Sequence, residues 1–204
     1  LSIKTAILTN KDPLENIIND YVKDHYQKGD TLCVAESALA IIQGRYVHYS
    51  DLEITIWAKI LSRYPDHLSS LATPGGIQLL INQVGLLRVI FAGVISGFFK
   101  LFNKNGWFYR LCGIQSKLID DVSGTLPPYD KHIVLGPNNL KVLVNNIYQK
   151  TNVKLAIVDV NDIKKVDILE CHSSCDNNFI KKMLKDNPSG NSDEQTPLTL
   201  IRQT

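Results

Sequence analysis

A short apolar run that passes directly into helix-forming residues is the feature that most constrains the fold of this chain. Residues 31–34 are apolar or β-branched and follow a turn sequence at 28–30, so they predict a buried strand. Residues 38–43 are mostly good helix formers, and Gly44 suits the position that ends a helix. The segment 29–45 is therefore predicted to contain a turn, an interior strand, a polar break and a helix.

Glu36 and Ser37 form the polar break between this strand and this helix. Free backbone N–H groups and the positive end of a helix dipole meet at such a point, and together they favour the binding of an anion. The alternative is that Ser37 caps the helix and that Glu36 is only a nearby charge. The local sequence leaves both interpretations open.

Strands and helices alternate along the rest of the chain, which predicts an α/β fold. Their order is not a regular Rossmann repeat, and the sequence contains no P-loop, no GxGxxG and no Ser-His-Asp spacing. The predicted strands cover residues 3–8, 31–34, 107–111, 133–135, 155–160, 166–170 and 198–201. The predicted helices cover 13–26 with Asp12 as N-cap, 38–43, 51–62, 75–84, 140–150 with Asn138 or Asn139 as N-cap, and 177–185.

Composition narrows the class of protein. A chain of 204 residues with 44% hydrophobic content suits one domain over residues 1–204, or two interleaved lobes. A net charge of +2 with scattered basic residues argues against nucleic-acid binding. Four cysteines outside any dense framework predict a reducing, cytoplasmic location. No signal peptide is expected, and because the chain begins at Leu1, its true start is expected upstream or trimmed.

One segment, residues 85–102, is apolar enough to raise the question of a membrane. Only 11 uncharged residues separate Arg88 from Lys100, whereas a transmembrane helix needs about 20. The segment is expected to be buried core; a subunit interface and contact with a membrane surface are the alternatives. Trp57, which lies at helical spacing with other apolar residues, is expected in the core.

Four segments, in order, carry a resemblance to a known family. They are GDTLCVAESALAIIQGR at 29–45, LCGIQSKLIDD at 111–121, KLAIVDVND at 154–162 and DEQTPLTLIR at 193–202. Together they resemble the coenzyme F-420:L-glutamate (gamma-glutamyl) ligases, and more closely a shorter, divergent ligase-like branch of that family. The resemblance implies a mixed-sheet α/β fold in a single gamma-glutamyl ligase-like domain.

The resemblance also implies an activity: GTP-dependent formation of an amide between a carboxylate-bearing deazaflavin cofactor and L-glutamate, with Mg²⁺ or Mn²⁺. It implies small-molecule partners and a homodimer. The residues expected to contact nucleotide or substrate are Glu36, Ser37, Gly44, Arg45, Gln115 and Ser116. The residues expected to bind the metal are Asp159, Asp162, Asp120 and Asp121.

Asp159 is the strongest metal candidate because it closes an apolar strand, which aims the carboxylate while the following loop leaves it hydrated. The alternative is an ordinary turn in which Asn161 and Asp162 bond to their own backbone. A second cluster, Cys171-His172-x-x-Cys175, could be completed as a metal site only by distant cysteines, and a loop cysteine pair is the favoured interpretation.

The departures from the family suggest a second function. Ser37 stands where the ligases have a lysine, and Gln115 stands where they have an aspartate. The segment after Asp159 lacks the family's Gly-Arg-Pro sequence. The alternative to an enzyme is therefore a non-catalytic relative that serves as a ligand-binding or assembly module.

Overall fold

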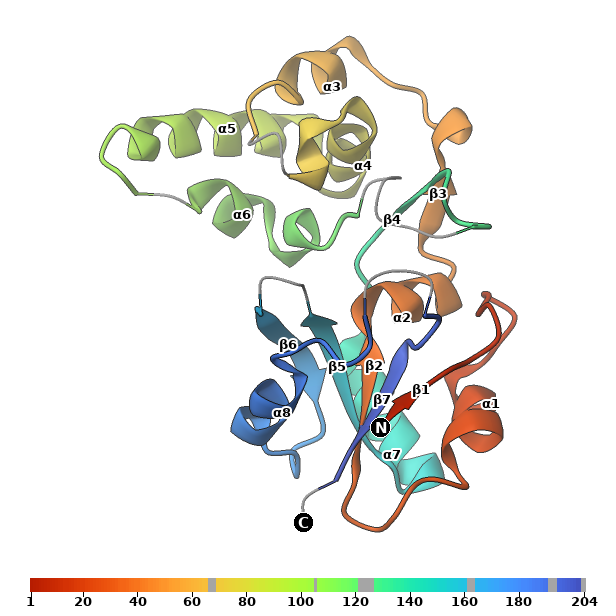
Figure 1. Ribbon diagram of the computed structural model, residues 1–204. Helices are drawn as coiled ribbons and strands as arrows, with labels where there is room; N and C mark the ends of the chain where they lie inside the picture. Colours follow the sequence, from red (N-terminus) through yellow and green to blue (C-terminus); the bar gives the residue numbers. More distant parts are fainter. Residues whose placement is uncertain (66–68, 105, 121–126, 161–163, 191–193, 203–204) are drawn as a thin grey trace. The chain divides into compact units, whose positions relative to one another are not determined.

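The computed structural model describes residues 1–65, 69–104, 106–120, 127–160, 164–190 and 194–202 (Figure 1). The chain forms two compact units. The first, called here the sheet unit, combines Leu1–Arg45 with Pro137–Thr204, and the second, called the helical unit, is Tyr46–Gly136. The single domain predicted over residues 1–204 stays a prediction, since a compact unit is not the same thing as a domain.

The sheet unit is built on a five-stranded mixed sheet in the order β1-β7-β2-β5-β6. β2 and β5 are parallel, and the other neighbouring strands are antiparallel. Its elements are β1 (Ser2–Ile3), α1 (Leu14–Ile17), the π-helical turn η1 (Ile18–Val22), β2 (Thr31–Ala35), α2 (Glu36–Ile42), α7 (Leu140–Thr151), β5 (Lys154–Val160), β6 (Val166–Cys171), α8 (Asn177–Leu184) and β7 (Leu198–Ile201). The predicted α/β mixed-sheet class is confirmed.

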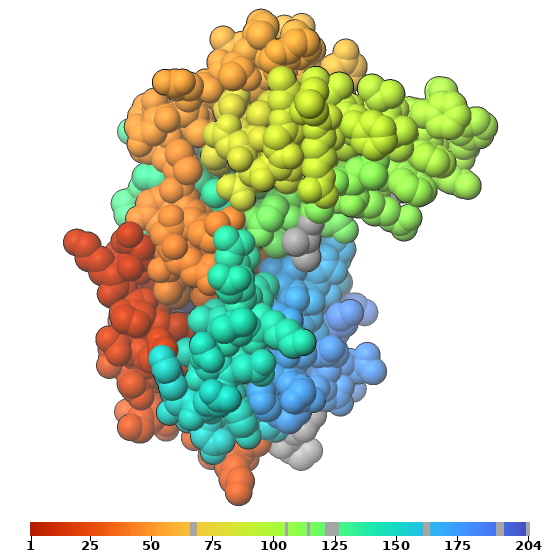
Figure 2. All heavy atoms as spheres, turned by 180° about the vertical axis from the view of Figure 1, so that it is seen from behind, coloured from red at the N-terminus to blue at the C-terminus, as the bar shows by residue number. Residues whose placement is uncertain are grey.

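Alternate residues of the central strands face two different layers of helices. Leu32 and Val34 pack in one cluster with residues of α1, α2 and α7, whereas Cys33 packs in another with Ile180 and Leu184 of α8. The period of two follows from the pleat, which turns successive side chains to opposite faces. Figure 2 shows α7, in teal, at the surface on the side seen from behind. The sheet is therefore covered on both faces, which explains why β2 and β5 are apolar almost throughout.

The helical unit has its own core. Leu71, Ile77, Leu80 and Val89 are buried there together with Ile133 of a small two-stranded sheet. Its elements are β3 (Tyr46–His48), η2 (Tyr49–Asp51), α3 (Ile56–Leu61), η3 (Ser70–Ala72), α4 (Pro74–Val84), α5 (Leu86–Lys100), α6 (Trp107–Cys112), η4 (Ile114–Lys117) and β4 (His132–Val134).

Several predicted elements of the helical unit were wrong. Residues 107–111, predicted as a strand, belong to helix α6. The indole ring of Trp107 in this helix stacks on the ring of Phe99, with ring centroids 4.3 Å apart. The helix predicted over 51–62 is a turn of 3-10 helix followed by α3, which Thr55 caps by accepting from the Ala58 N–H. Tertiary packing decided both cases against local propensity.

Two predicted helix caps in the sheet unit were also wrong. Asp12 does not cap α1, because its carboxylate accepts hydrogen bonds from the backbone N–H and the hydroxyl of Thr9. Asn139 occupies the N-cap position of α7, but in a left-handed conformation and with no side-chain cap. The first strand is shorter than predicted and ends at Ile3.

The apolar segment 85–102 is not buried core as expected. Within α5 only Val89 and Ala92 are buried, and Trp57 of α3 is also exposed. In the described part of the chain no single helix is long and apolar enough to cross a membrane; α4 and α5 reach that length only together, with a bend of 113° between them. The expectation that apolar segments lie inside therefore fails for this helix.

Candidate functional site

The parallel pair β2 and β5 brings two carboxylates to one edge of the sheet. Ala35, the last residue of β2, is in register with Val158 of β5, and the next residues along the two segments are Glu36, which opens α2, and Asp159 of β5. The carboxyl edge of parallel strands is where open α/β sheets usually bind ligands. Contact of Glu36 with nucleotide or substrate, and of Asp159 with a metal, stay predictions.

The start of β7 lies at this edge as well. β7 runs antiparallel to β2, and the N–H of Ala35 donates to the carbonyl of Pro197 at 2.9 Å. The turn that enters β7 therefore borders the carboxyl edge. Of the four aspartates predicted to bind the metal, Asp121 and Asp162 lie outside the described residues.

Asp159 is a half-buried carboxylate with an acidic neighbour. It lies opposite Asp167 in the antiparallel β5–β6 ladder. Burial, and then the charge of Asp167, raise the pKa of Asp159, whereas Lys165 lowers it. Lys165 donates to Asp167 at 2.7 Å. Asp159 therefore sits where a nearby cation would offset an otherwise unfavourable negative charge.

Glu36 is the first residue of α2 and is only 6% exposed. Its carboxylate lies at the positive end of the helix, where a negative charge is favourable. Ser37 does not cap this helix, because α2 begins at Glu36 and Ala35 holds the N-cap position without a side-chain hydrogen bond. The cap interpretation of Ser37 was wrong, and the buried carboxylate is the more constrained residue of the pair.

Gly44 ends α2 as predicted. It has a φ of +67°, and its N–H donates to the carbonyl of Ile41, while the N–H of Arg45 donates to that of Ala40. This pairing is the common left-handed termination of a helix, for which glycine carries no steric penalty. Gly44 therefore acts by turning the chain, which directs Arg45 away from the helix axis.

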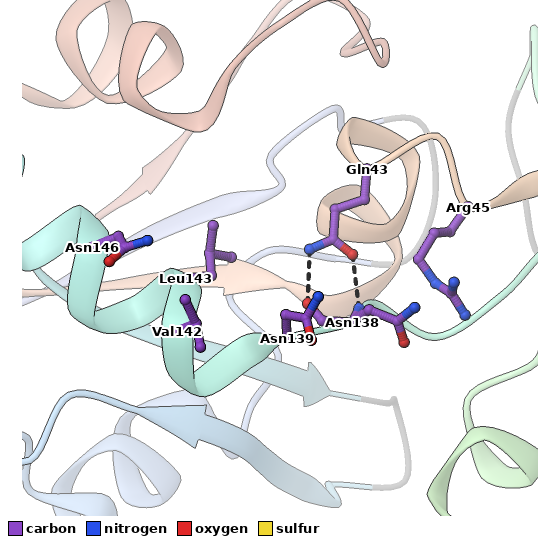
Figure 3. Close-up of a pocket in the computed structure, with 7 residues that line it drawn as sticks. All are labelled: Gln43, Arg45, Asn138, Asn139, Val142, Leu143 and Asn146. Atoms are coloured by element: carbon purple, nitrogen blue, oxygen red, sulfur yellow. Dashed lines mark hydrogen bonds between the residues drawn. The ribbon is translucent and has the colours of Figure 1, made fainter.

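Arg45 lines a pocket of about 400 Å³ in the sheet unit. Gln43 closes one side by a two-point hydrogen bond with the backbone of Asn138: its amide donates to the carbonyl at 3.0 Å and accepts from the N–H at 2.8 Å (Figure 3). The remaining lining residues are Asn139, Val142, Leu143 and Asn146. The pocket therefore holds one guanidinium group among carboxamide and aliphatic side chains at the start of α7.

The electrostatics of this pocket favour an anion. Burial lowers the pKa of Arg45 from its ordinary value, but an arginine remains charged at neutral pH. The first turn of α7 has no side-chain cap, and the N-terminus of a 12-residue helix attracts negative charge. A guanidinium beside such a helix start is suited to a phosphate or carboxylate group.

The Arg45 pocket and the two carboxylates lie toward the same end of the sheet unit. α7 ends at Thr151 and β5 begins at Lys154, so the two elements run in opposite directions. The start of α7 is therefore near the carboxyl end of β5, where Asp159 lies. An anionic ligand that reaches from the Arg45 pocket to the two carboxylates would be bound by Arg45 at one end. At the other end, a cation would be needed to offset the negative charges of the ligand and the carboxylates.

The remaining predicted site residues belong to the helical unit. Ser116 is buried, and its hydroxyl donates to the carbonyl of Gly113 at 2.6 Å. This hydrogen bond stabilises the turn after α6. Asp120 pairs through its backbone with Val134. Gln115 lies beside Gly136, where an added Cβ would be 3.1 Å from its side-chain oxygen. Their roles as ligand contacts stay predictions.

The structure shows one feature that sequence reasoning missed. His48 and His132 are cross-strand partners in the β3–β4 pair, with ring centroids 5.0 Å apart, and the rings of Tyr46 and Tyr129 pack edge-on around His132. The Nδ1 atom of His132 is buried with no hydrogen-bond partner among the described residues. No local motif marks this cluster, because its members come together only through strand pairing.

The cysteine cluster does not form a metal site among the residues that the structure describes. The thiol of Cys171 bonds to the side chain of Asn177, the ring of His172 stacks on Tyr148, and Cys175 lies near Thr31. Cys171 is the last residue of β6 and Cys175 lies in the turn that follows, so only one of the two cysteines is in a loop. In the same described residues, no group of three or more acidic, histidine or cysteine side chains converges on a metal position.

Comparison with known proteins agrees with the family resemblance. The sequence profile described as F420-0:Gamma-glutamyl ligase matches residues 2–93, which supports assignment of the chain to that family and a ligase-like function. The matched region contains Glu36, Gly44 and Arg45 but ends before Asp159. A search of curated proteins finds no match.

Proposed function

We propose that this chain is a GTP- and divalent-metal-dependent amide ligase that joins L-glutamate, or a related amine, to a carboxylate-bearing cofactor. The observation that carries the proposal is the placement of Glu36, directly after β2, and of Asp159, near the end of the parallel strand β5, at the end of the sheet unit that also holds the Arg45 pocket. The family match supports the ligase class. A cytoplasmic homodimer is part of the proposal by family resemblance.

The proposal includes a hydrated magnesium or manganese ion at these two carboxylates. Mg²⁺ is commonly held by one or two carboxylates, with substrate phosphates and water completing the shell. Glu36 and Asp159 would hold it; burial and the charge of Asp167 raise the pKa of Asp159, and a bound cation would lower it. When bound, the ion would neutralise charge on the phosphates.

The reaction has to activate a carboxylate before the amine attacks it. Transfer of the γ-phosphoryl group from GTP to the substrate carboxylate breaks the terminal P–O bond and releases GDP. Attack by the amine on the resulting acyl phosphate forms the amide and releases inorganic phosphate and a proton. Arg45 is proposed to hold an anionic group of one substrate in its carboxamide-lined pocket, which fixes that group for the transfer.

Calorimetry tests the nucleotide step directly. We expect GTP to bind the intact chain only in the presence of Mn²⁺ or Mg²⁺, and Asp159→Asn to abolish this metal-dependent binding. Asp186→Asn is a matched control, since Asp186 is exposed in the same unit and pairs only loosely with Lys164. Absence of any heat of binding with the intact chain would rule out the proposed ligase.

The second candidate is a non-catalytic relative that keeps ligand binding. The observation that favours it is Ser37, which is not a helix cap and stands where the ligases have a lysine. Release of phosphate from GTP in the presence of glutamate and a carboxylate acceptor separates the two, because only the ligase gives turnover. If Ser37→Lys creates turnover in a chain that otherwise only binds GTP, the non-catalytic candidate is supported.

A further inference from the structure

An apolar stripe runs along the exposed side of α5 and into the turn at 101–102 that follows it in the helical unit. Its members recur at helical spacing and are 57% to 84% exposed: Leu87, Phe91, Val94, Phe98, Leu101 and Phe102. Intervals of four and three residues keep the first five on one face of the helix. Figure 2 shows residues of the yellow-green range, which includes α5, at the surface. No charged side chain interrupts the stripe.

The opposite side of α5 is the one that packs in the core of the helical unit. Val89 and Ala92 are the buried residues of α5, and they pack with Leu80 and Cys112. One face of α5 is therefore packed in the core of the helical unit, and a second apolar face is exposed. Exposed apolar faces of this extent usually mark a binding surface.

The charged residues that flank the stripe in the sequence are all positive. The sequence has no aspartate or glutamate between Asp66 and Asp120, whereas it has Arg88, Lys100, Lys104, Arg110 and Lys117 in that interval. Lys100 lies in the last turn of α5, and Arg110 lies over the ring of Trp107, 5.5 Å from its centroid. A partner for this surface must therefore be apolar at its centre and negative at its edges.

A second copy of the chain does not meet this requirement. Two stripes packed against each other would bring the cations of one copy toward those of the other, with no carboxylate in the interval 67–119 to pair with them. Repulsion between like charges disfavours that contact. The membrane interface does meet the requirement, since acyl chains accept the aromatic and aliphatic side chains and anionic headgroups pair with the flanking lysines.

We propose that α5 binds the surface of an anionic lipid membrane, with Phe91, Phe98 and Phe102 entering the interface and Lys100 and Lys104 pairing with headgroups. α5 has 15 residues and is therefore about 22 Å long. It lies in the plane of the interface rather than across the bilayer. This inference is independent of the ligase activity, because none of its residues belongs to the candidate site.

Vesicle flotation with the full chain tests the proposal. We expect the protein to float with vesicles of phosphatidylcholine and phosphatidylserine in equal parts, and to stay behind with phosphatidylcholine alone. Phe91→Ser combined with Phe98→Ser should abolish flotation, whereas Met183→Ser, an exposed apolar residue of α8, should not. The phenylalanines are exposed, so circular dichroism should show unchanged folding in the double variant.

Charge variants test the electrostatic part. Lys100→Gln combined with Lys104→Gln should weaken binding about 30-fold, because each basic residue near an anionic surface contributes roughly 1 kcal/mol. Lys181→Gln combined with Lys182→Gln is the control pair on α8. Equal binding to neutral and anionic vesicles, or no binding to either, would overturn the proposal. So would a dimer, measured by light scattering, that the Phe91 and Phe98 substitutions convert to monomer.

Discussion

Arg202, which follows β7, forms a two-point ion pair with Asp30, in the turn that precedes β2. Its Nε donates to one carboxylate oxygen at 3.0 Å and a terminal nitrogen donates to the other at 2.8 Å. Asp30 is only 2% exposed and also accepts from the N–H of Gln27. The pair joins the first and last of the four family-like segments. Arg202 therefore has a structural role, because it ties the end of β7 to the turn before β2.

We expect Asp30→Asn to destabilise the protein by about 2 kcal/mol, since it replaces charge-assisted hydrogen bonds at a buried position with weaker ones. Urea unfolding measures this change. Glu15→Gln is the matched control, because the Lys150–Glu15 pair is more exposed and should contribute roughly 0.5 kcal/mol or less. Equal effects from the two substitutions would contradict the role given to Asp30.

The same pair predicts a loss of stability in acid. Arg202 holds the pKa of Asp30 below its ordinary value, with help from the N–H of Gln27. A lowered pKa in the folded state means that this stabilisation is complete above the unfolded value of about 4, and that it disappears as the pH falls through the folded pKa. Below about pH 4, the free energy of unfolding should therefore fall less steeply for Asp30→Asn than for the unaltered chain.

Asp159→Asn is expected to stabilise the chain while it removes metal-dependent nucleotide binding. Because the pKa of Asp159 is raised in the folded state, the folded carboxyl holds its proton more tightly than the unfolded one. Stability therefore falls as the pH rises from the unfolded pKa to the folded pKa, and asparagine avoids that loss. We expect a gain of up to about 1 kcal/mol at neutral pH, measured by urea unfolding without metal.

A companion variant separates the two causes of the shift. Asp167→Asn removes the neighbouring charge but leaves Asp159 as buried as before. It should lower the pKa of Asp159 part of the way toward its ordinary value, as followed by NMR titration of the carboxyl carbon. An unchanged pKa would show that the cross-strand charge has no influence.

Gly44→Ala should destabilise the protein by about 1 kcal/mol, because alanine is strained at a φ of +67°. The added Cβ would meet Asn10 at an ordinary distance of 3.5 Å, so the cost comes from the backbone and not from crowding. Gly93→Ala is the opposite case: it lies inside α5 with open space around it, and helix propensity predicts a gain of up to about 1 kcal/mol. Thermal unfolding of the two variants should shift in opposite directions.

Arg45→Lys should weaken the binding of inorganic pyrophosphate or GTP by about tenfold, since lysine keeps the charge but cannot offer a planar, two-point contact. Calorimetry gives the ratio. Arg63→Lys, a substitution in the helical unit at a residue that does not line the Arg45 pocket, should leave the affinity unchanged. Equal affinity of Arg45→Lys and the unaltered chain would remove Arg45 from the proposed anion site.

The sequence by itself determined the central part of the fold. The strand over 31–35, the helix that Gly44 ends, and the strands at 154–160 and 198–201 all follow from apolar runs and turn residues, whose effects are local. It also indicated that Glu36 follows a strand and that Asp159 lies near the end of one. It did not determine the helical state of 107–112 or the exposure of the stripe on α5, because periodicity shows that a face is apolar but not what covers it.

Only the tertiary structure decided which of these residues lie side by side. The parallel register of β2 and β5 places Glu36 and Asp159 at one level, and the hydrogen bonds between Gln43 and Asn138 build the Arg45 pocket from segments 95 residues apart. Strand order and long-range pairing depend on how the helices cover both faces of the sheet, which no local pattern encodes. The sequence thus supplied the chemical groups and the local turns that present them, and the packing of the sheet brought them to one end.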